Sequence, residues 1–295
     1  MLYCFVRHLT TRLLTGLLTI VALVTITPAQ ICAQEAPAGF FRTDRINMLV
    51  AVIFFSIVVL IYTRWAKQGK PLFIRKINGL DAVEEAVGRA TEMGKPVLFI
   101  PGLQEIDEIE TIAGISILGR VAKITAQYET PLIVPVRYPM VLAAGMEVVE
   151  QAYTEAGRQD SYNKDTVRYV AGDQMAFAAT VNGMMVREKP AANIFMGAFF
   201  AESLLLAETG NAVGSIQIAG TARPEQIPFF IAACDYTLMG EELYAASAYL
   251  SHEPLLLGGL KGQDLMKLVI IASIIIGIVL TLFGVQTTFT SWFHQ

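Results

Sequence analysis

Histidine and cysteine are scarce in this chain, which has only three of each among its 295 residues. From residue 64 to residue 264 the sequence holds one histidine, His252, and one cysteine, Cys234, so a Cys/His zinc cluster cannot form within one chain. We interpret His252 as an exposed loop residue and Cys234 as a small buried side chain rather than a nucleophile. Cys4 and Cys32 lie in or near the N-terminal segment, and no disulfide framework is indicated. The sequence therefore indicates no metal site and no cofactor.

Basic runs and nucleotide-binding motifs are also missing. The formal net charge is −4, and Lys/Arg-rich stretches occur only beside the apolar runs, which argues against a nucleic-acid partner. No P-loop occurs, and no G-x-G-x-x-G opens a helix after a strand. The acidic string "QEIDEIE", residues 104–110, could hold a divalent cation, but we favour a structural role in a first helical turn, where the helix dipole stabilises negative charge.

Apolar residues are abundant: 54% of the chain is hydrophobic and 16% is charged, which is typical of a membrane protein with a sizeable soluble part. Residues 46–63 and 267–284 are predicted transmembrane helices. Residues 1–33 read as a signal peptide or an N-terminal anchor, and residues 285–295 as a short external tail. Basic residues after the first span and before the second predict that residues 64–264 are cytoplasmic.

A third apolar run, residues 194–207 in "NIFMGAFFAESLLLAETGNAVG", is not expected to cross the membrane. It spans about 14 residues and contains Glu202, and a carboxylate near the centre of a span costs a few kcal/mol. We predict a strand over residues 193–196 that turns at Gly197 into an apolar helix ending near Gly210.

Strand and helix patterns alternate throughout residues 64–264. The predicted strands, short and continuously apolar, are residues 71–75, 96–100, 131–136, 166–170, 193–196, 215–220 and 228–234, and a last helix covers residues 238–250. This pattern predicts an α/β domain, with a mainly parallel sheet covered by helices on both faces, inserted between transmembrane helices. Because the link "TARPEQI" is too short for a parallel crossover, strands 215–220 and 228–234 are expected to pair as a hairpin at one edge or to lie in separate layers.

The strings "GKPVLFIPG", "ETPLIVPVRYP" and "NIFMGAFFAESLLLAETG" carry a resemblance to an uncharacterised bacterial and archaeal family of membrane-anchored proteins with a cytoplasmic α/β domain, a domain of unknown function. The resemblance implies a multi-pass protein of the bacterial or archaeal cell membrane. It supplies no catalytic residues.

Polar and glycine residues follow several predicted strands, and in an open parallel sheet such residues gather at the carboxyl edge, where many α/β proteins bind ligands. The candidate ligand-binding residues are Gly102, Arg137, Gly172, Asp173, Gly220, Thr221 and Asp235. Arg137 is the best candidate for holding an anion. The glycines also have an ordinary role, since they let the chain turn from strand into helix.

Two consecutive helices lack the charged face that a helix on a two-sided sheet should present to solvent. Residues 174–186 carry no charge, and residues 198–207 carry only Glu202. They pack either into a deep core or against another subunit. The candidate oligomer-interface residues are Ala179, Gly183, Met185, Ala198 and Ala201.

We therefore favour a non-enzymatic, membrane-anchored assembly or scaffold protein whose domain associates with copies of itself or with a protein partner. The alternative is an enzyme or small-ligand sensor that uses the crevice at the carboxyl ends of the strands.

Overall fold

A computed structural model of the chain describes residues 46–68, 78–251 and 254–282. The chain divides into two compact units, one formed by Met1–Leu60 together with Gly262–Gln295 and the other by Ile61–Lys261. His252 and the predicted strand over residues 71–75 lie outside the described residues.

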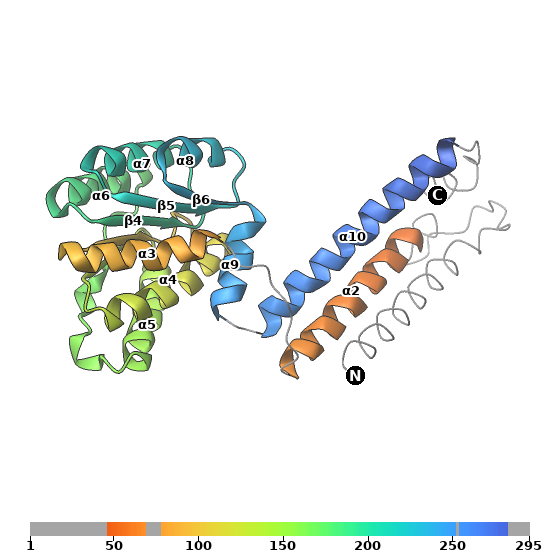
Figure 1. The fold of residues 1–295 in the computed structure, drawn as a ribbon, viewed down its shortest axis with the longest axis horizontal. Helices are drawn as coiled ribbons and strands as arrows, with labels where there is room; N and C mark the ends of the chain where they lie inside the picture. Colours follow the sequence, from red (N-terminus) through yellow and green to blue (C-terminus); the bar gives the residue numbers. More distant parts are fainter. Residues whose placement is uncertain (1–45, 69–77, 252–253, 283–295) are drawn as a thin grey trace. The chain divides into compact units, whose positions relative to one another are not determined.

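The larger unit contains a six-stranded sheet (Figure 1). In sequence order the strands are β1 (Val97–Ile100), β2 (Leu132–Val136), β3 (Val167–Tyr169), β4 (Ala192–Met196), β5 (Ile216–Thr221) and β6 (Tyr236–Met239). Their order across the sheet is β3-β2-β1-β4-β5-β6, and every neighbouring pair is parallel. The predicted α/β class with a mainly parallel sheet is confirmed.

Helices cover both faces of the sheet (Figure 1). One face carries α3 (Asn78–Met93), α4 (Ile109–Gln127), α5 (Pro139–Glu155) and α9 (Glu241–Ser251); the other carries α6 (Gln174–Glu188), α7 (Glu202–Val213) and α8 (Ile227–Ala233). Two short 3-10 turns, η2 (Gln159–Ser161) and η3 (Lys164–Thr166), precede β3.

Alternate strand residues supply the two hydrophobic cores, because successive side chains of a strand point to opposite faces. On β1, Phe99 packs into the core beneath α4 and α5, whereas Leu98 and Ile100 pack into the core beneath α6 and α7. All three side chains are almost completely buried. Because β1 is buried on both faces, all of its residues are apolar.

The segment from β4 to α7, which contains the third apolar run of the sequence, has the predicted order of elements. β4 covers Ala192–Met196, Gly197 adopts a φ of 141°, and α7 ends at Val213, with Gly214 in the left-handed conformation at its C-terminus. Glu202 is buried at the start of α7, where it accepts hydrogen bonds from the side chain of Gln174 and from the Phe200 N–H at 2.8 Å. The expected order of strand, turn and helix is confirmed, but the helix begins only at Glu202 and not directly after Gly197.

Two assignments near the end of the domain were wrong. Residues 228–234, expected as a strand, form most of α8, and the expected helix over residues 238–250 begins only at Glu241, after β6. A short apolar run such as "IPFFIAA" has no periodicity that separates a strand from a helical turn, and Pro228 suits the first turn of a helix. Because α8 supplies a crossover, β5 and β6 pair in parallel rather than as a hairpin.

Two long helices cover the predicted spans. α2 (Ile46–Lys67) and α10 (Pro254–Leu282) are the two helices in the described ranges that are long and apolar enough to cross a membrane. Gly258 and Gly262 lie one turn apart on α10 and allow it to approach α2. A Cβ on Gly258 would lie 2.5 Å from the Thr63 Cα, and one on Gly262 would lie 2.8 Å from a methyl carbon of Val59. Small residues at this spacing are typical of helix pairs in membranes.

A pair of glycine substitutions tests the packing of α4 on the sheet. A Cβ added at buried Gly114 would lie 2.3 Å from the Met196 carbonyl oxygen, so Gly114→Ala should destabilise the fold by about 1–3 kcal/mol through overpacking. Gly88 on α3 has nothing within 4 Å of such an atom, so Gly88→Ala should stabilise by up to about 1 kcal/mol through helix propensity. Thermal unfolding of the full chain in mild detergent should move in opposite directions for the two variants. Equal shifts would contradict the packing of α4 against β4.

Candidate functional site

The strand order places a topological switch between β1 and β4, because the chain moves outward from β1 through β2 to β3 and then returns to β4. In doubly wound folds with this order, ligands bind in the crevice beyond the carboxyl ends of the two strands at the switch. The segments that would line this crevice are the turns after β1, from Pro101 to Leu103, and after β4, from Gly197 to Phe200.

Direct backbone contact fills this crevice. The Leu103 N–H donates a hydrogen bond to the Ala198 carbonyl oxygen at 2.8 Å. Gly102 and Gly197 both have positive φ, and a Cβ on Gly102 would lie 2.8 Å from the Ala198 nitrogen. A Cβ on Gly197 would likewise lie 2.7 Å from the Pro101 carbonyl oxygen. The glycines here bring the backbones of the two loops into direct contact.

Arg137 lies at the carboxyl end of β2, as expected, but its donors serve the protein itself. Its Nε donates to the Gly172 carbonyl oxygen at 2.8 Å, and a terminal nitrogen donates to the Leu103 carbonyl oxygen at 3.1 Å. Its guanidinium carbon also lies 5.0 Å from the centre of the Tyr138 ring. Arg137 therefore ties together the loops that follow β1, β2 and β3.

The other expected ligand residues have structural contacts and do not all meet. Asp173 caps α6 by accepting a hydrogen bond from the Ala176 N–H at 2.9 Å. Thr221 is fully buried at the end of β5, and its hydroxyl accepts from the Arg223 N–H at 3.2 Å. Gly220 is enclosed by the side chains of Met196, Leu243 and Leu238. Asp235 precedes β6 and so lies at the amino edge of the parallel sheet, opposite to the expected edge.

An ionic cluster at the carboxyl edge was not recognised in the sequence. Glu110, in the first turn of α4, lies 3.2 Å from the Nε of Arg223, which follows β5. Arg223 also pairs with Glu108 at 3.4 Å and stacks over the Phe200 ring at 5.3 Å. The sequence showed Glu108 and Glu110 as part of the acidic string at residues 104–110. It gave no sign that they contact Arg223, which lies over a hundred residues further along the chain.

Burial raises the pKa values of two side chains in this part of the domain, Glu110 and Tyr244. The Glu110 side chain is 9% exposed, and loss of solvation raises the pKa of its carboxyl group, although Arg223 and the Ala222 N–H act in the opposite direction. Burial, together with the charge of Glu110, also raises the pKa of Tyr244 on α9. The cluster thus joins α4, the loop after β5 and α9 by electrostatic contact. Among residues 46–68, 78–251 and 254–282, no group of three or more His, Cys, Asp and Glu side chains could hold a metal ion.

Cys234 forms the C-terminal cap of α8 rather than the end of a strand. Burial raises the pKa of its thiol to about 12, and the neighbouring Asp235 acts in the same direction. The thiolate is the nucleophilic form, so Cys234 stays protonated near neutral pH and does not have the properties of a catalytic cysteine.

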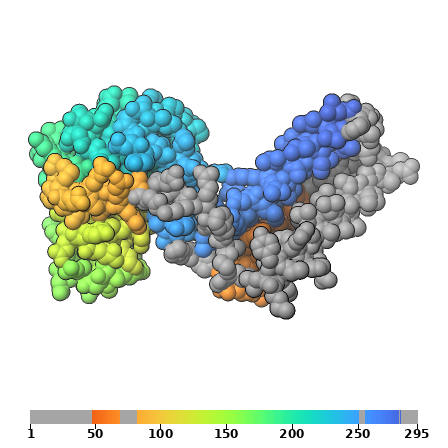
Figure 2. All heavy atoms as spheres, viewed as in Figure 1, coloured from red at the N-terminus to blue at the C-terminus, as the bar shows by residue number. Residues whose placement is uncertain are grey.

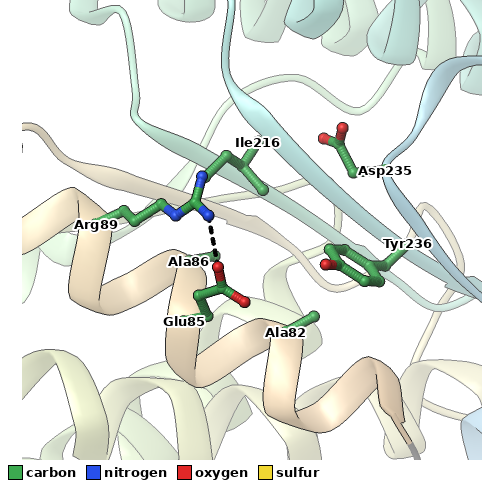
Figure 3. A pocket seen from close by; sticks show the side chains of 7 residues that line it. All are labelled: Ala82, Glu85, Ala86, Arg89, Ile216, Asp235 and Tyr236. Carbon is green, nitrogen blue, oxygen red and sulfur yellow. Dashed lines mark hydrogen bonds and ion pairs between the residues drawn. The ribbon is translucent and has the colours of Figure 1, made fainter.

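An open hollow of about 300 Å³ lies between α3 and the amino edge of β5 and β6 (Figure 3). Its charged residues are paired: Arg89 contacts Glu85 at 2.5 Å, and Asp235 accepts from the Gln217 N–H at 2.8 Å. Tyr236 completes the polar part of the lining.

The expected interface residues divide into two groups. Ala179 and Ala201 are exposed, and Gly183 is half-buried on the outer side of α6. Met185 and Ala198 are fully buried in the monomer, so their inclusion in an interface was wrong. The apolar composition of the two helices was read correctly, but the sequence did not show which of their sides would face the sheet.

The raised pKa of Glu110 predicts an unusual pH dependence. The folded chain holds this proton more tightly than the unfolded chain, so wild type should gain stability relative to Glu110→Gln as pH falls towards the ordinary value of 4.5. Glu155 supplies a control of opposite sign, because Lys123 lowers its pKa. Relative to Glu155→Gln, wild type should lose stability as pH falls below 4.5. Thermal unfolding from about pH 7 to about pH 3 measures both differences, and a flat Glu110→Gln difference would contradict the burial argument.

The family of the chain follows from comparison with known proteins. Comparison with curated proteins and with solved structures found no match. A family model described as "Domain of unknown function (DUF6754)" matches residues 36–293, which include both long helices and the whole α/β unit. The chain therefore belongs to the DUF6754 family.

Proposed function

We propose that this protein is a membrane-anchored, non-enzymatic assembly or scaffold protein whose α/β domain associates with copies of itself through α6, α7 and α8. One observation carries this proposal: the outer surfaces of the two helical layers differ in chemistry. One layer carries ion pairs between neighbouring helices, whereas the other contains long uncharged stretches in α6 and α8 beside exposed apolar side chains.

The layer of α3, α4, α5 and α9 carries ion pairs between neighbouring helices, and it also exposes Ile109, Ile112 and Met140. Arg120 of α4 contacts Glu84 of α3 at 2.9 Å, and Lys123 of α4 contacts Glu155 of α5 at 3.0 Å. Pairs this exposed add little stability, but they show that this surface is suited to water.

The layer of α6, α7 and α8 lacks such a surface over much of its area. The seven residues of α8 carry no charge, and neither do residues 174–186 of α6. The three helices lie side by side in one continuous outer surface (Figure 2). Its exposed large apolar side chains are Met175 (50% exposed), Val186 (56%), Leu205 (47%), Phe229 (40%) and Ile231 (54%). An apolar surface of this kind typically marks an interaction site.

Anchoring by α2 and α10 supports assembly. Both helices expose apolar side chains along their length, including Leu60 and Ile275, and such helices need lipid or a protein partner around them. Confinement to a membrane raises the effective concentration of the domain, so a modest contact between domains suffices for association.

An enzyme or ligand sensor at the carboxyl ends of the strands remains the alternative hypothesis. It would need space between the loops after β1 and β4, where the Leu103–Ala198 hydrogen bond lies, and two of the five guanidinium N–H groups of Arg137 already donate to backbone carbonyl groups. These contacts favour the assembly hypothesis.

Ala179→Arg tests self-association. The wild-type chain in mild detergent should have a protein mass, by light scattering, of at least twice the 32.2 kDa of one chain. A charge at exposed Ala179 should convert it to a monomer, because an unpaired guanidinium is costly to bury in an apolar contact. The matched control is Ala143→Arg, at an exposed position of α5 on the charged layer, which should leave the mass unchanged. A monomeric wild type would refute the proposal, and an intact Ala179→Arg oligomer would refute the assignment to this surface.

Reporter fusions test the topology. We expect the α/β domain to be cytoplasmic, because Arg64 and Lys67 follow the apolar part of α2 and Lys261 precedes that of α10. Reporters fused after Gly69 and after Gln295 should then report opposite sides of the membrane. Two fusions on the same side would contradict a cytoplasmic domain between two spans.

A further inference from the structure

The outer side of α6 is uncharged between its two ends. Met175, Ala176, Ala179, Thr180 and Val186 are exposed there. The charges begin only at the termini and differ in sign. Asp173 is exposed at the N-terminal end; Arg187, Glu188 and Lys189 are exposed at the C-terminal end, where the basic residues outnumber the acidic one. Charges of these signs also suit the helix dipole, but the dipole does not account for the uncharged stretch between them.

The middle of this side permits close approach of another helix. Ala179 and Gly183 lie one turn apart, and Ala179 is exposed whereas Gly183 is half-buried. A Cβ on Gly183 would meet only the mobile end of the Arg187 side chain, at 3.0 Å. Two backbones can therefore come closer here than at either end of the helix, where Met175 and Val186 project.

We propose that the occupant of this surface is α6 of a second copy, antiparallel to the first, with the two-fold axis passing near Val181. Positions equally far before and after Val181 then face each other across the interface. Ala179 lies against Gly183 of the second copy, and Asp173 lies beside Lys189 of the second copy. This inference rests on the proposed self-association and specifies its geometry.

Charge complementarity selects the antiparallel arrangement. In a parallel pair, Asp173 would lie beside Asp173 of the second copy and Lys189 beside Lys189, so like charges would meet at both ends. In the antiparallel pair each end brings together opposite charges, and the dipoles of the two helices also oppose each other. Because the two copies are related by two-fold symmetry, the Asp173–Lys189 contact occurs twice, once at each end of the helix pair.

Disulfide trapping distinguishes these arrangements in the full chain in mild detergent. The background carries Cys4→Ser, Cys32→Ser and Cys234→Ser, which removes all three native cysteines. Chains carrying Ala179→Cys and chains carrying Gly183→Cys are co-expressed with different tags and then oxidised. A disulfide bond forms only between residues whose Cα atoms are close together. In the antiparallel pair, residue 179 of one copy is shifted by about 6 Å along the helix axis from residue 179 of the other copy, whereas it lies level with residue 183.

We expect mixed-tag disulfide dimers to form several-fold faster than dimers of either variant alone, and an Ala143→Cys control to form none. Trapping of Ala179→Cys with itself at an equal or greater rate would overturn the antiparallel register. The antiparallel register would also be overturned if light scattering still showed an oligomer but no mixed-tag dimer was trapped. A monomeric wild type would instead refute the self-association on which the register depends.

Charge exchange gives a second readout. Asp173→Lys and Lys189→Asp should each weaken the oligomer, and the double variant should restore it, because the double variant re-forms both pairs with reversed signs. Since Asp173 also caps α6, thermal unfolding checks that each variant remains folded. The proposed pairing of Asp173 with Lys189 is wrong if the double variant associates no more strongly than the weaker of the two single variants.

Discussion

The contact between the loops after β1 and β4 is the constraint on which the functional interpretation depends. These strands are neighbours at the centre of the sheet, and the Leu103–Ala198 hydrogen bond extends their contact beyond the last strand residues. Gly102 and Gly197 make this approach possible, since a side chain at either position would collide with the opposite backbone. The strand order alone would favour a ligand crevice at this point, but the local geometry occupies it with peptide groups.

The two outer helical layers differ in their charges: ion pairs join the helices of one layer, and α6 and α8 of the other contain long uncharged stretches. In chain order, α3 follows α2 and α9 precedes α10, so both segments that connect to the long helices begin in the charged layer. The apolar layer of α6, α7 and α8 consists entirely of crossovers within the domain. The Glu110–Arg223 contact lies between α4 and the loop after β5, and Tyr244 of α9 responds to its charges. The charged layer thus keeps its elements in electrostatic contact with the carboxyl edge of the sheet.

Much of the fold could be predicted from the sequence because its strands are buried on both faces and separated by clear turns. Val97–Ile100, Leu132–Val136 and Ala192–Met196 were each expected within one residue. α8 was missed because a seven-residue apolar segment has no diagnostic periodicity. The site was predicted less well, because its decisive contacts join distant parts of the chain. Arg137 was correctly placed at a strand end, but its bonds to Leu103 and Gly172 depend on loop geometry. Met185 was assigned to a surface because composition does not show which side of a helix faces the sheet, and Ala198 because it was expected in a helix that begins only at Glu202.

The central position of β1 also affects the order in which the domain can form during synthesis. β1 is the first strand described in the chain, but Val97 pairs with Ala192, which emerges only after α4, β2, α5, β3 and α6. Until then β1, β2 and β3 can pair among themselves while one edge of β1 presents unpaired peptide groups and fully apolar side chains. Parallel pairing over such sequence separations folds slowly and exposes an edge that can capture another chain. A chain that has completed only β1, β2 and β3 therefore leaves this edge of β1 unpaired until β4 is available, and β4 in turn needs β5.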